Sequence, residues 1–387
     1  MRLRAILLLV IAAATVSADE AVVVRRVPNG GLKASAVVDE AGLLHLVYFR
    51  GAPQAGDAFY VTSRNGGATF SEPIRINSEA SAVLGASSAR GPHLALGRGG
   101  RIHVLWAGSS TAKPRAPLNP ALAADSPYNG TPLLYTHLEP GSSAFDAPKN
   151  LMTKTTALDG DSSIAADVDG HVYVAWHGQL PEGKGEQDRS VWLSRSDDEG
   201  KTFTAEYDVL PEPTGVCACC GLTVSAAPGG AVAILYRVAE QKVHRGMRLL
   251  ESTDGGRKFT ARPLDEWQVA MCPMSTAALL PGKTPVFFGA WENQGRVFLA
   301  SLPSGTPAEF GPKDINRKHP SLARNGRGEY LAAWVEGISF GKGGNVGWQR
   351  FDATGKPMGE PGRAGDLPGN GNVAAVALKD GSFAVIY

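Results

Sequence analysis

Several features are scarce in this chain, and each scarcity excludes a class of protein. The 38 Lys and Arg residues are balanced by 37 Asp and Glu, so the formal net charge is only +1. Without clustered basic residues, neither nucleic acid nor an anionic membrane surface is expected as a partner. Beyond the N-terminus no apolar run is long enough to span a bilayer. Apolar residues at helical spacing are almost absent, which argues against a helical protein.

The N-terminus predicts an export signal. Arg2 and Arg4 precede an apolar run over residues 5–14, and Val16-Ser17-Ala18 provides the small residues that signal peptidase requires. No cysteine follows the run, so we expect no lipid anchor. Residues 1–18 are therefore predicted to be a cleaved signal peptide. Residues 19–387 are predicted to form one domain that is periplasmic or secreted.

What is abundant is glycine and proline, with 47 and 26 residues. A pattern of two strands joined by a Gly or Asp turn recurs every ~45–70 residues, the spacing of propeller blades or solenoid units. Its second strand is very apolar and often ends in Trp or Tyr. The copies span residues 32–50, 92–106, 162–177, 221–237, 275–291, 320–334 and 372–387. The pattern predicts an all-β fold, a β-propeller.

A second pattern lies between the hairpins, Ser-x-Asx-x-Gly followed by an aromatic residue. It occurs at residues 63–70, 196–203 and 252–259. The Asx side chain and the glycine are suited to close a turn between the third and fourth strands of a blade. We expect the aromatic residue to pack between neighbouring sheets, and we assign the turn no chemistry.

The blade count follows from the last hairpin, which ends at the C-terminus without outer strands. The segment 20–28 precedes the first hairpin and is predicted to complete the last blade, closing the ring. Seven blades are therefore favoured, with six as the alternative. Residues 108–132, rich in Ala, Pro and Ser, are predicted to form a surface loop.

The four cysteines come directly before two neighbouring hairpins. Cys217, Cys219 and Cys220 precede the fourth, and Cys272 precedes the fifth. Propeller topology places both segments at one mouth of the central channel. Three interpretations stay open: two structural disulfides, a soft-metal site suited to Cu(I), and a redox-active thiol pair. Cys219 and Cys220 are adjacent and cannot pair with each other without strain.

Other polar residues are expected at the same mouth. Each also has an alternative without a binding role. The histidines could be hydrogen-bonded residues at strand ends, the carboxylates could be solvated loop residues, and the methionines could be packing residues. The residues are His93, Asp161, Met271, Met274 and His319 before first strands, and Arg50, His177, Arg237, Glu292 and Glu336 after second strands.

These motifs resemble the sialidase-like BNR-repeat, or Asp-box, β-propeller family over nearly the whole chain after residue 18. A narrower likeness covers residues 217–280. It is to a bacterial subgroup in which C-x-C-C opens one blade and Cys-Pro opens the next. The matching residues are Cys217, Cys219, Cys220, Tyr236, Arg237, Arg245 or Arg248, Trp267, Cys272 and Pro273, with the turn at residues 252–259.

The family resemblance implies exo-α-sialidase chemistry as one alternative. Such enzymes clamp a sugar carboxylate with three arginines and use a Tyr nucleophile, its activating Glu and an Asp acid/base. The candidates for the clamp and the nucleophile are Arg50, Arg237, Arg245 and Tyr236. Leu32-Lys33-Ala34 stands where the first arginine is expected, and the similar Arg26-Val27-Pro28 comes too early.

The sequence favours a non-hydrolytic, exported propeller that binds a ligand at its cysteine-bearing mouth, with Cu(I) as the candidate cofactor. The metal ligands would be Cys217, Cys219, Cys220 and Cys272, with Met271 or Met274 as extras. Arg237, Trp267 and His177 would surround the ligand. The alternatives are an exo-α-sialidase-type hydrolase of an anionic sugar, and a glycan- or protein-binding scaffold with structural disulfides.

Overall fold

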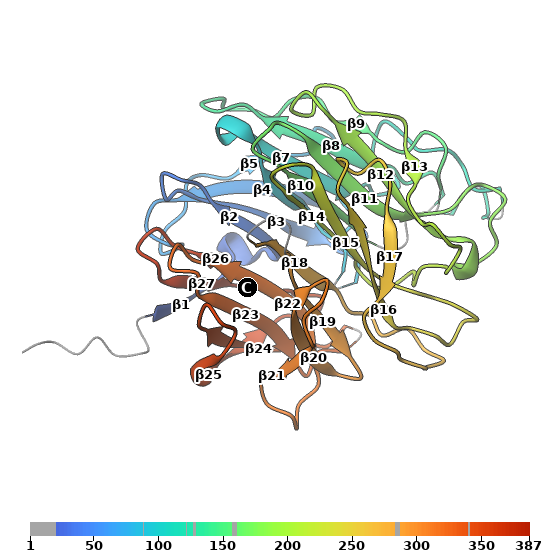
Figure 1. Ribbon diagram of the computed structural model, residues 1–387. Helices are drawn as coiled ribbons and strands as arrows, with labels where there is room; N and C mark the ends of the chain where they lie inside the picture. Colours follow the sequence, from blue (N-terminus) through green and yellow to red (C-terminus); the bar gives the residue numbers. More distant parts are fainter. Residues whose placement is uncertain are drawn as a thin grey trace, which may run out of the picture.

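Seven sheets surround a common axis in the computed structural model of the chain (Figure 1). The structure describes residues 21–87, 89–120, 122–126, 129–156, 161–282, 287–339 and 341–387, so the predicted signal peptide lies outside the described residues. The protein is thus an all-β, seven-bladed propeller. The seven predicted hairpins are the first two strands of the seven blades.

The strands of the first four blades are the following. Blade 1 is β2 (Leu32–Val38), β3 (Leu44–Ala52), β4 (Ala55–Ser63) and β5 (Ile74–Arg75); blade 2 is β6 (His93–Leu96), β7 (Ile102–Ala107), β8 (Leu133–Leu138) and β9 (Lys149–Asn150). Blade 3 is β10 (Ser162–Ala166), β11 (Val172–Gly178), β12 (Ser190–Ser196) and β13 (Tyr207–Asp208); blade 4 is β14 (Thr223–Ala227), β15 (Ala231–Arg237), β16 (Met247–Ser252) and β17 (Thr260–Pro263).

The remaining strands complete the ring. Blade 5 is β18 (Ala277–Pro281), β19 (Phe287–Asn293), β20 (Arg296–Leu302) and β21 (Ala308–Phe310); blade 6 is β22 (Arg317–Arg324), β23 (Tyr330–Glu336), β24 (Gly344–Phe351) and β25 (Pro357–Leu367). Blade 7 is β26 (Ala374–Ala377) and β27 (Phe383–Ile386), with β1 (Val22–Arg25) paired in parallel to β27. Single 3₁₀ turns lie at Pro28–Gly30, Arg98–Gly100 and Glu186–Asp188.

The second strands are apolar on both faces because a neighbouring blade covers each face. Every residue of β11, β15 and β23 is buried. Trp176 near the end of β11 and Trp291 near the end of β19 are fully buried and fill the space between sheets.

The ring is continuous. The first strands contact one another in a closed cycle from β2 through β6, β10, β14, β18 and β22 to β26, which contacts β2 again. Within the described chain, seven hydrophobic clusters each join two neighbouring blades. Figure 1 shows β1 beside β27 at the end of the chain. The favoured count of seven blades is confirmed over six.

The three Ser-x-Asx-x-Gly turns share one hydrogen-bond pattern and join third to fourth strands, as expected. In the second copy the Ser196 hydroxyl donates to Asp198 Oδ1 at 2.7 Å and accepts from the Gly200 amide at 2.8 Å. Phe203 then packs edge-on against Tyr135 of the preceding blade, with ring centroids 4.7 Å apart. The turns therefore fasten neighbouring sheets.

The described part of the segment 108–132 combines buried and exposed residues. Ala112 and Ala116 are buried and belong to the clusters on the two sides of blade 2, while Leu118 is exposed. Among the described residues no helix is long and apolar enough to cross a membrane.

Candidate functional site

The cysteine cluster lies where blades 3, 4 and 5 meet. Cys219 and Cys272 form a disulfide across 53 residues of sequence, which ties the loop before β14 to the loop before β18. The two segments thus share one mouth of the channel. Cys272 is exposed and Cys219 half-buried, so the disulfide lies at the surface of the cluster.

Cys217 and Cys220 are free thiols beneath that disulfide, and both are fully buried. A tight turn brings them together, because the Cys220 amide donates to the Cys217 carbonyl at 3.4 Å. Cys217 Sγ lies 3.3 Å from Cys220 Sγ and 3.7 Å from Cys219 Sγ. The adjacent residues Cys219 and Cys220 have different partners.

The two buried thiols have opposite acidity. The hydrogen bond that Cys217 donates to Cys220, together with burial, raises the pKa of Cys217. Burial opposes ionisation of Cys220, but the Cys217 hydrogen bond and the Arg237 charge outweigh it and lower the pKa of Cys220. Of the two thiols, Cys220 is therefore the more acidic.

Arg237, the last residue of β15, is 1% exposed and connects the blades that carry the cysteines. Its guanidinium donates to the Arg245 carbonyl at 2.7 Å and to Glu292 Oε2 at 3.2 Å, and lies 5.0 Å from the Trp267 ring centroid. Its carbonyl accepts the Cys217 amide at 3.0 Å. Arg237 thus contacts the cysteine turn, and Trp267 packs on Arg237.

Blade 3 supplies Glu186, which is not among the predicted site residues. Glu186 Oε2 accepts from Arg245 at 2.7 Å, and Glu186 Oε1 accepts from the Ala218 amide at 2.9 Å. One oxygen of Glu186 and the sulfurs of Cys217 and Cys272 lie within 4.8 Å of one another. Arg245 is only 4% exposed, so two buried arginines flank the cysteines.

Three further predicted residues, Tyr236, Arg50 and His177, have other surroundings. Tyr236 points to the opposite side of its strand, where its hydroxyl meets Thr214 Oγ1 at 2.9 Å and burial raises its pKa to about 12. Arg50 is exposed on blade 1, opposite Asp57 of β4. His177 is fully buried, and within the described chain neither ring nitrogen has a hydrogen-bond partner.

The two methionines beside Cys272 differ in exposure. Met271 is 66% exposed, and Met274 is half-buried with a left-handed φ of 52°. Met271 therefore faces solvent beside the disulfide in this conformation.

A second polar group lines the channel itself. A cavity of about 220 Å³ is bounded by His93, Asp161, His319 and Asn372, among other residues. His93 Nε2 lies 3.0 Å from Asp161 Oδ1. His319 is 2% exposed, and its Nε2 has no hydrogen-bond partner in the described part of the chain.

Lys33 of β2 is near this group and is 3% exposed. Burial lowers its pKa to about 7, although Asp161 opposes the shift, and its ammonium donates to the Ser87 carbonyl. Burial lowers the pKa of His319 to about 3, and the Lys33 charge adds to the effect. Lys33 and His319 both have left-handed backbone, with φ of 61° and 50°, which stores strain at the mouth.

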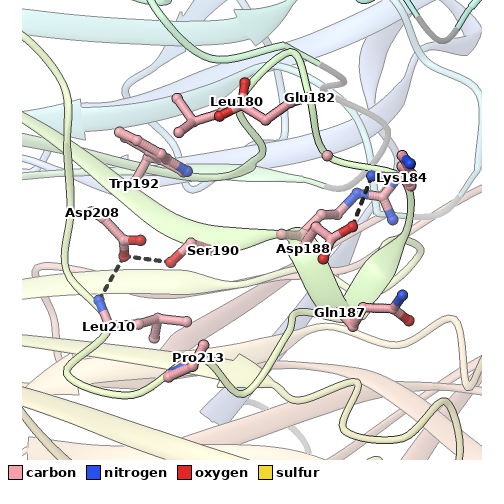
Figure 2. A pocket seen from close by; sticks show the side chains of 12 residues that line it. Leu180, Glu182, Lys184, Gln187, Asp188, Ser190, Trp192, Asp208, Leu210 and Pro213 are labelled. Atoms are coloured by element: carbon pink, nitrogen blue, oxygen red, sulfur yellow. Dashed lines mark hydrogen bonds between the residues drawn. The ribbon is translucent and has the colours of Figure 1, made fainter.

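A larger pocket of about 590 Å³ opens at the outer part of blade 3 (Figure 2). Figure 2 shows Leu180 and Trp192 above Asp208, which accepts hydrogen bonds from the Ser190 hydroxyl and the Leu210 amide. The Trp192 indole N–H already donates to the Gly178 carbonyl at 3.1 Å. The loop of residues 179–189 lines this pocket and also contains Glu186.

Two features of the sequence bear on residues that its motifs did not mark as functional. Cys217 and Cys220 are separated by two residues within C-x-C-C, a spacing that can bring two thiols together in one turn. Lys33 is predicted only as the residue that stands in place of an arginine, whereas its burial makes it a charged group of the channel mouth. Glu186 lies in a loop of blade 3, and no motif in the sequence marks it.

Comparison with known proteins supports the fold. No protein-family model matches the chain, and no curated protein matches it. Solved structures do match: a Penicillium chrysogenum α-L-arabinanase complexed with arabinobiose is 16% identical, with 85% of this chain and 95% of that chain covered and a TM-score of 0.55. A Hadza microbial sialidase is 13% identical over 78% and 62%, with a TM-score of 0.52. Trypanosoma rangeli sialidase is 11% identical over 80% and 53%, also at 0.52.

At these identities the likeness shows the fold alone. The chain has a propeller fold of the sialidase and arabinanase type, which confirms the structural part of the predicted resemblance. Membership of the BNR-repeat family, and of the C-x-C-C subgroup within it, stays a prediction.

Proposed function

We propose that this is an exported, non-hydrolytic binding propeller whose cysteine cluster holds a soft metal ion, with Cu(I) as the best fit. The observation that carries the proposal is the convergence of the Cys217, Cys219 and Cys220 sulfurs within 4.8 Å. Thiolates that share one ion at about 2.3 Å lie no more than about 4.6 Å apart, so small shifts would suffice. Thiolate sulfur selects soft ions.

Charge supports the same function. A Cu(I) ion held by two or three thiolates carries a net negative charge, which is costly to bury without compensation. Arg237 and Arg245 are both buried beside the cysteines, and each is paired with a carboxylate, Glu292 and Glu186, so they offset part of that cost. Cys217 and Cys220 would bind in the state described here, and Cys219 and Cys272 would join after reduction of their disulfide.

The test is an anaerobic Cu(I) titration of the reduced mature protein, in competition with a chromophoric Cu(I) chelator and with native mass spectrometry as the second readout. We expect one bound ion, lost in the Cys217→Ser/Cys220→Ser double variant. Met152→Leu, a change in the core of blade 2, is the control and should bind as the wild type does. A folded variant with all four cysteines replaced by serine that kept its copper would refute the proposal.

A second candidate is an anionic ligand in the channel cavity, and the buried, unsatisfied His319 beside Lys33 favours it. A carboxylate there would accept hydrogen bonds from the Lys33 ammonium and from His319 Nε2–H, and the ion pair would offset the cost of burying Lys33. Two of the proteins with a matching fold are sialidases.

Calorimetry with N-acetylneuraminate, beside a neutral sugar of similar size, tests this candidate. We expect heat of binding for the acid only, and its loss in Lys33→Met. Turnover of a fluorogenic sialoside would extend the candidate to a hydrolase, and its loss in Arg237→Ala would place that activity at the predicted clamp. Absence of binding and turnover for several acidic sugars would exclude it.

A further inference from the structure

The Cys217 sulfur lies between a thiol and a disulfide. It is 3.3 Å from Cys220 Sγ and 3.7 Å from Cys219 Sγ, and Cys219 is bonded to Cys272. Thiol–disulfide exchange starts when one sulfur attacks a sulfur of a disulfide, and access between the sulfurs helps to set its rate. In this fold the attacking and attacked sulfurs are already in contact.

We propose that the cluster is a thiol–disulfide exchange centre, in which Cys217 is the internal nucleophile that opens the Cys219–Cys272 disulfide and Cys272 is the sulfur that meets external thiols. The proposal needs no metal ion, so it stands apart from the proposed copper function. It assigns different roles to cysteines that a purely structural disulfide would leave inert.

The internal step moves a disulfide without net oxidation. The Cys217 proton passes to Cys220, to which Cys217 already donates a hydrogen bond, as the Cys217 sulfur attacks Cys219 Sγ. A Cys217–Cys219 bond forms, the Cys219–Cys272 bond breaks, and Cys272 leaves as a thiolate that takes its proton from solvent. Cys220 can then attack Cys217, which releases Cys219 and leaves a disulfide between Cys217 and Cys220. Each isomer contains one disulfide and two thiols.

The external step is a two-electron reduction by thiols of the medium. A small thiol attacks Cys272 Sγ and forms a mixed disulfide while Cys219 leaves as a thiol. A second small thiol displaces Cys272, so two external thiols become one external disulfide and the protein gains two thiols. Cys272 is the point of attack because it is exposed, whereas Cys217 and Cys220 are fully buried.

The surroundings hold the reacting turn in place during exchange. The Cys217 amide donates a hydrogen bond to the Arg237 carbonyl at 3.0 Å, and the Ala218 amide donates one to Glu186 Oε1 at 2.9 Å. The Gly221 amide donates to the Ser275 carbonyl at 3.0 Å, so a hydrogen bond still joins the loops of blades 4 and 5 after the disulfide opens. Exchange therefore frees Cys272 without separating the blades.

The experiment traps the thiol that the internal step releases. Metal-free mature protein, purified without reductant, is incubated under native conditions with a bulky polymer-linked maleimide, quenched in acid, unfolded, treated with a second alkylating reagent and mapped by mass spectrometry. We expect time-dependent labelling of Cys272 in the wild type, with a new disulfide that contains Cys217. In Cys217→Ser the rate should fall by about tenfold or more, since the internal nucleophile is missing.

Controls separate exchange from unfolding. Ser225→Ala, a buried change in β14 of the same blade that keeps all four cysteines, should label as the wild type does. Should Cys217→Ser fold poorly, Cys217→Ala provides the same test. The wild type alone also decides the matter: a Cys272 that stays unlabelled, with Cys219–Cys272 as the only disulfide recovered, overturns the proposal.

A second arm uses reduced glutathione as the external thiol. Intact-mass and peptide mapping should place the mixed disulfide on Cys272, and a mixed disulfide on Cys219 instead would contradict the assigned point of attack. Failure of the exchange proposal can be distinguished from failure of the proposed copper binding, because the labelling is done without metal and the copper titration is done on fully reduced protein.

Discussion

At the scale of single residues, the burial of charged side chains is the main free-energy cost at this site. Arg237 is 1% exposed, and its partners are Glu292, two carbonyls and the face of Trp267. A buried ion pair adds little stability by itself, but removal of one partner leaves an uncompensated charge. The arginine is therefore held in place by its neighbours and contributes a fixed positive charge beside Cys220.

Arg237→Met should lower the free energy of unfolding by about 3–5 kcal/mol, because Glu292 is left buried without its partner. Adding Glu292→Gln should recover part of the loss. Denaturant unfolding of the two single variants and the double variant gives the coupling energy. Strict additivity of the two single effects would show that the pair does not interact.

Lys33 makes stability depend on pH. Its pKa falls from the ordinary 10.5 to about 7 in the folded protein. Between these values the unfolded chain binds a proton that the folded protein does not, so this residue makes stability rise with pH from about 7 to about 10.5, by at most about 1.4 kcal/mol per pH unit.

In Lys33→Met that rise should be missing. The measurement is the difference in unfolding free energy between wild type and variant, at several pH values from 7 to 10. Both proteins contain the same buried thiols, so subtracting the unfolding free energy of the variant at each pH removes the contribution of the thiols to the pH dependence. Parallel pH curves would mean that Lys33 keeps its ordinary pKa when folded.

At the scale of elements, the Ser-x-Asx-x-Gly turn couples local backbone to packing between blades. Gly200 has a φ of 76°, in the left-handed region. A Cβ at this position would lie 1.7 Å from the Tyr135 hydroxyl, which is itself held by His103 Nδ1 at 2.7 Å. The glycine is required both by the turn and by the neighbouring blade.

Gly200→Ala should therefore destabilise the protein more than a left-handed backbone alone explains. Backbone strain is worth roughly 1 kcal/mol, and the clash with Tyr135 should add about 1–3 kcal/mol. Gly99→Ala is the matched control, since Gly99 has a φ of 69° and nothing within 4 Å of its added Cβ. Equal melting temperatures for the two variants would contradict the packing role.

At the scale of the whole molecule, the ring is held together by contacts between neighbouring blades. Blades 4 and 5 share a hydrophobic cluster, the Arg237–Glu292 ion pair and the Cys219–Cys272 disulfide. The disulfide spans 53 residues, so it restricts the unfolded chain as well as joining two blades of the folded one.

The Cys219→Ser/Cys272→Ser double variant should be less stable by about 4 kcal/mol, the loop-closure value for a chain of this separation. Guanidinium unfolding without reductant measures the difference, and reductant should bring the wild type toward the variant. An unchanged midpoint would mean that contacts between blades alone fix the unfolding free energy of this region.

The sequence predicted the ring well and the site in part. The alternation of apolar hairpins with turns identified all seven blades, because strand patterns and turn residues are local properties of the chain. The position of the cysteines before the fourth and fifth hairpins predicted their meeting, since propeller topology brings such loops to one mouth. The expectation that Arg237 and Trp267 would surround a bound ligand stays a prediction, and in the structure the two side chains pack on each other.

Which cysteines pair, and which charges surround them, only the tertiary structure decided. Spacing excluded a Cys219–Cys220 bond but did not choose among the remaining partners, because the choice depends on where each Cβ points after the turn folds. Glu186 and Lys33 lie far from the cysteines in sequence and acquire their roles from burial and from neighbours on other blades. Patterns of apolar residues and turns determined the architecture, whereas side-chain direction, burial and electrostatics at the meeting of three blades determined the site.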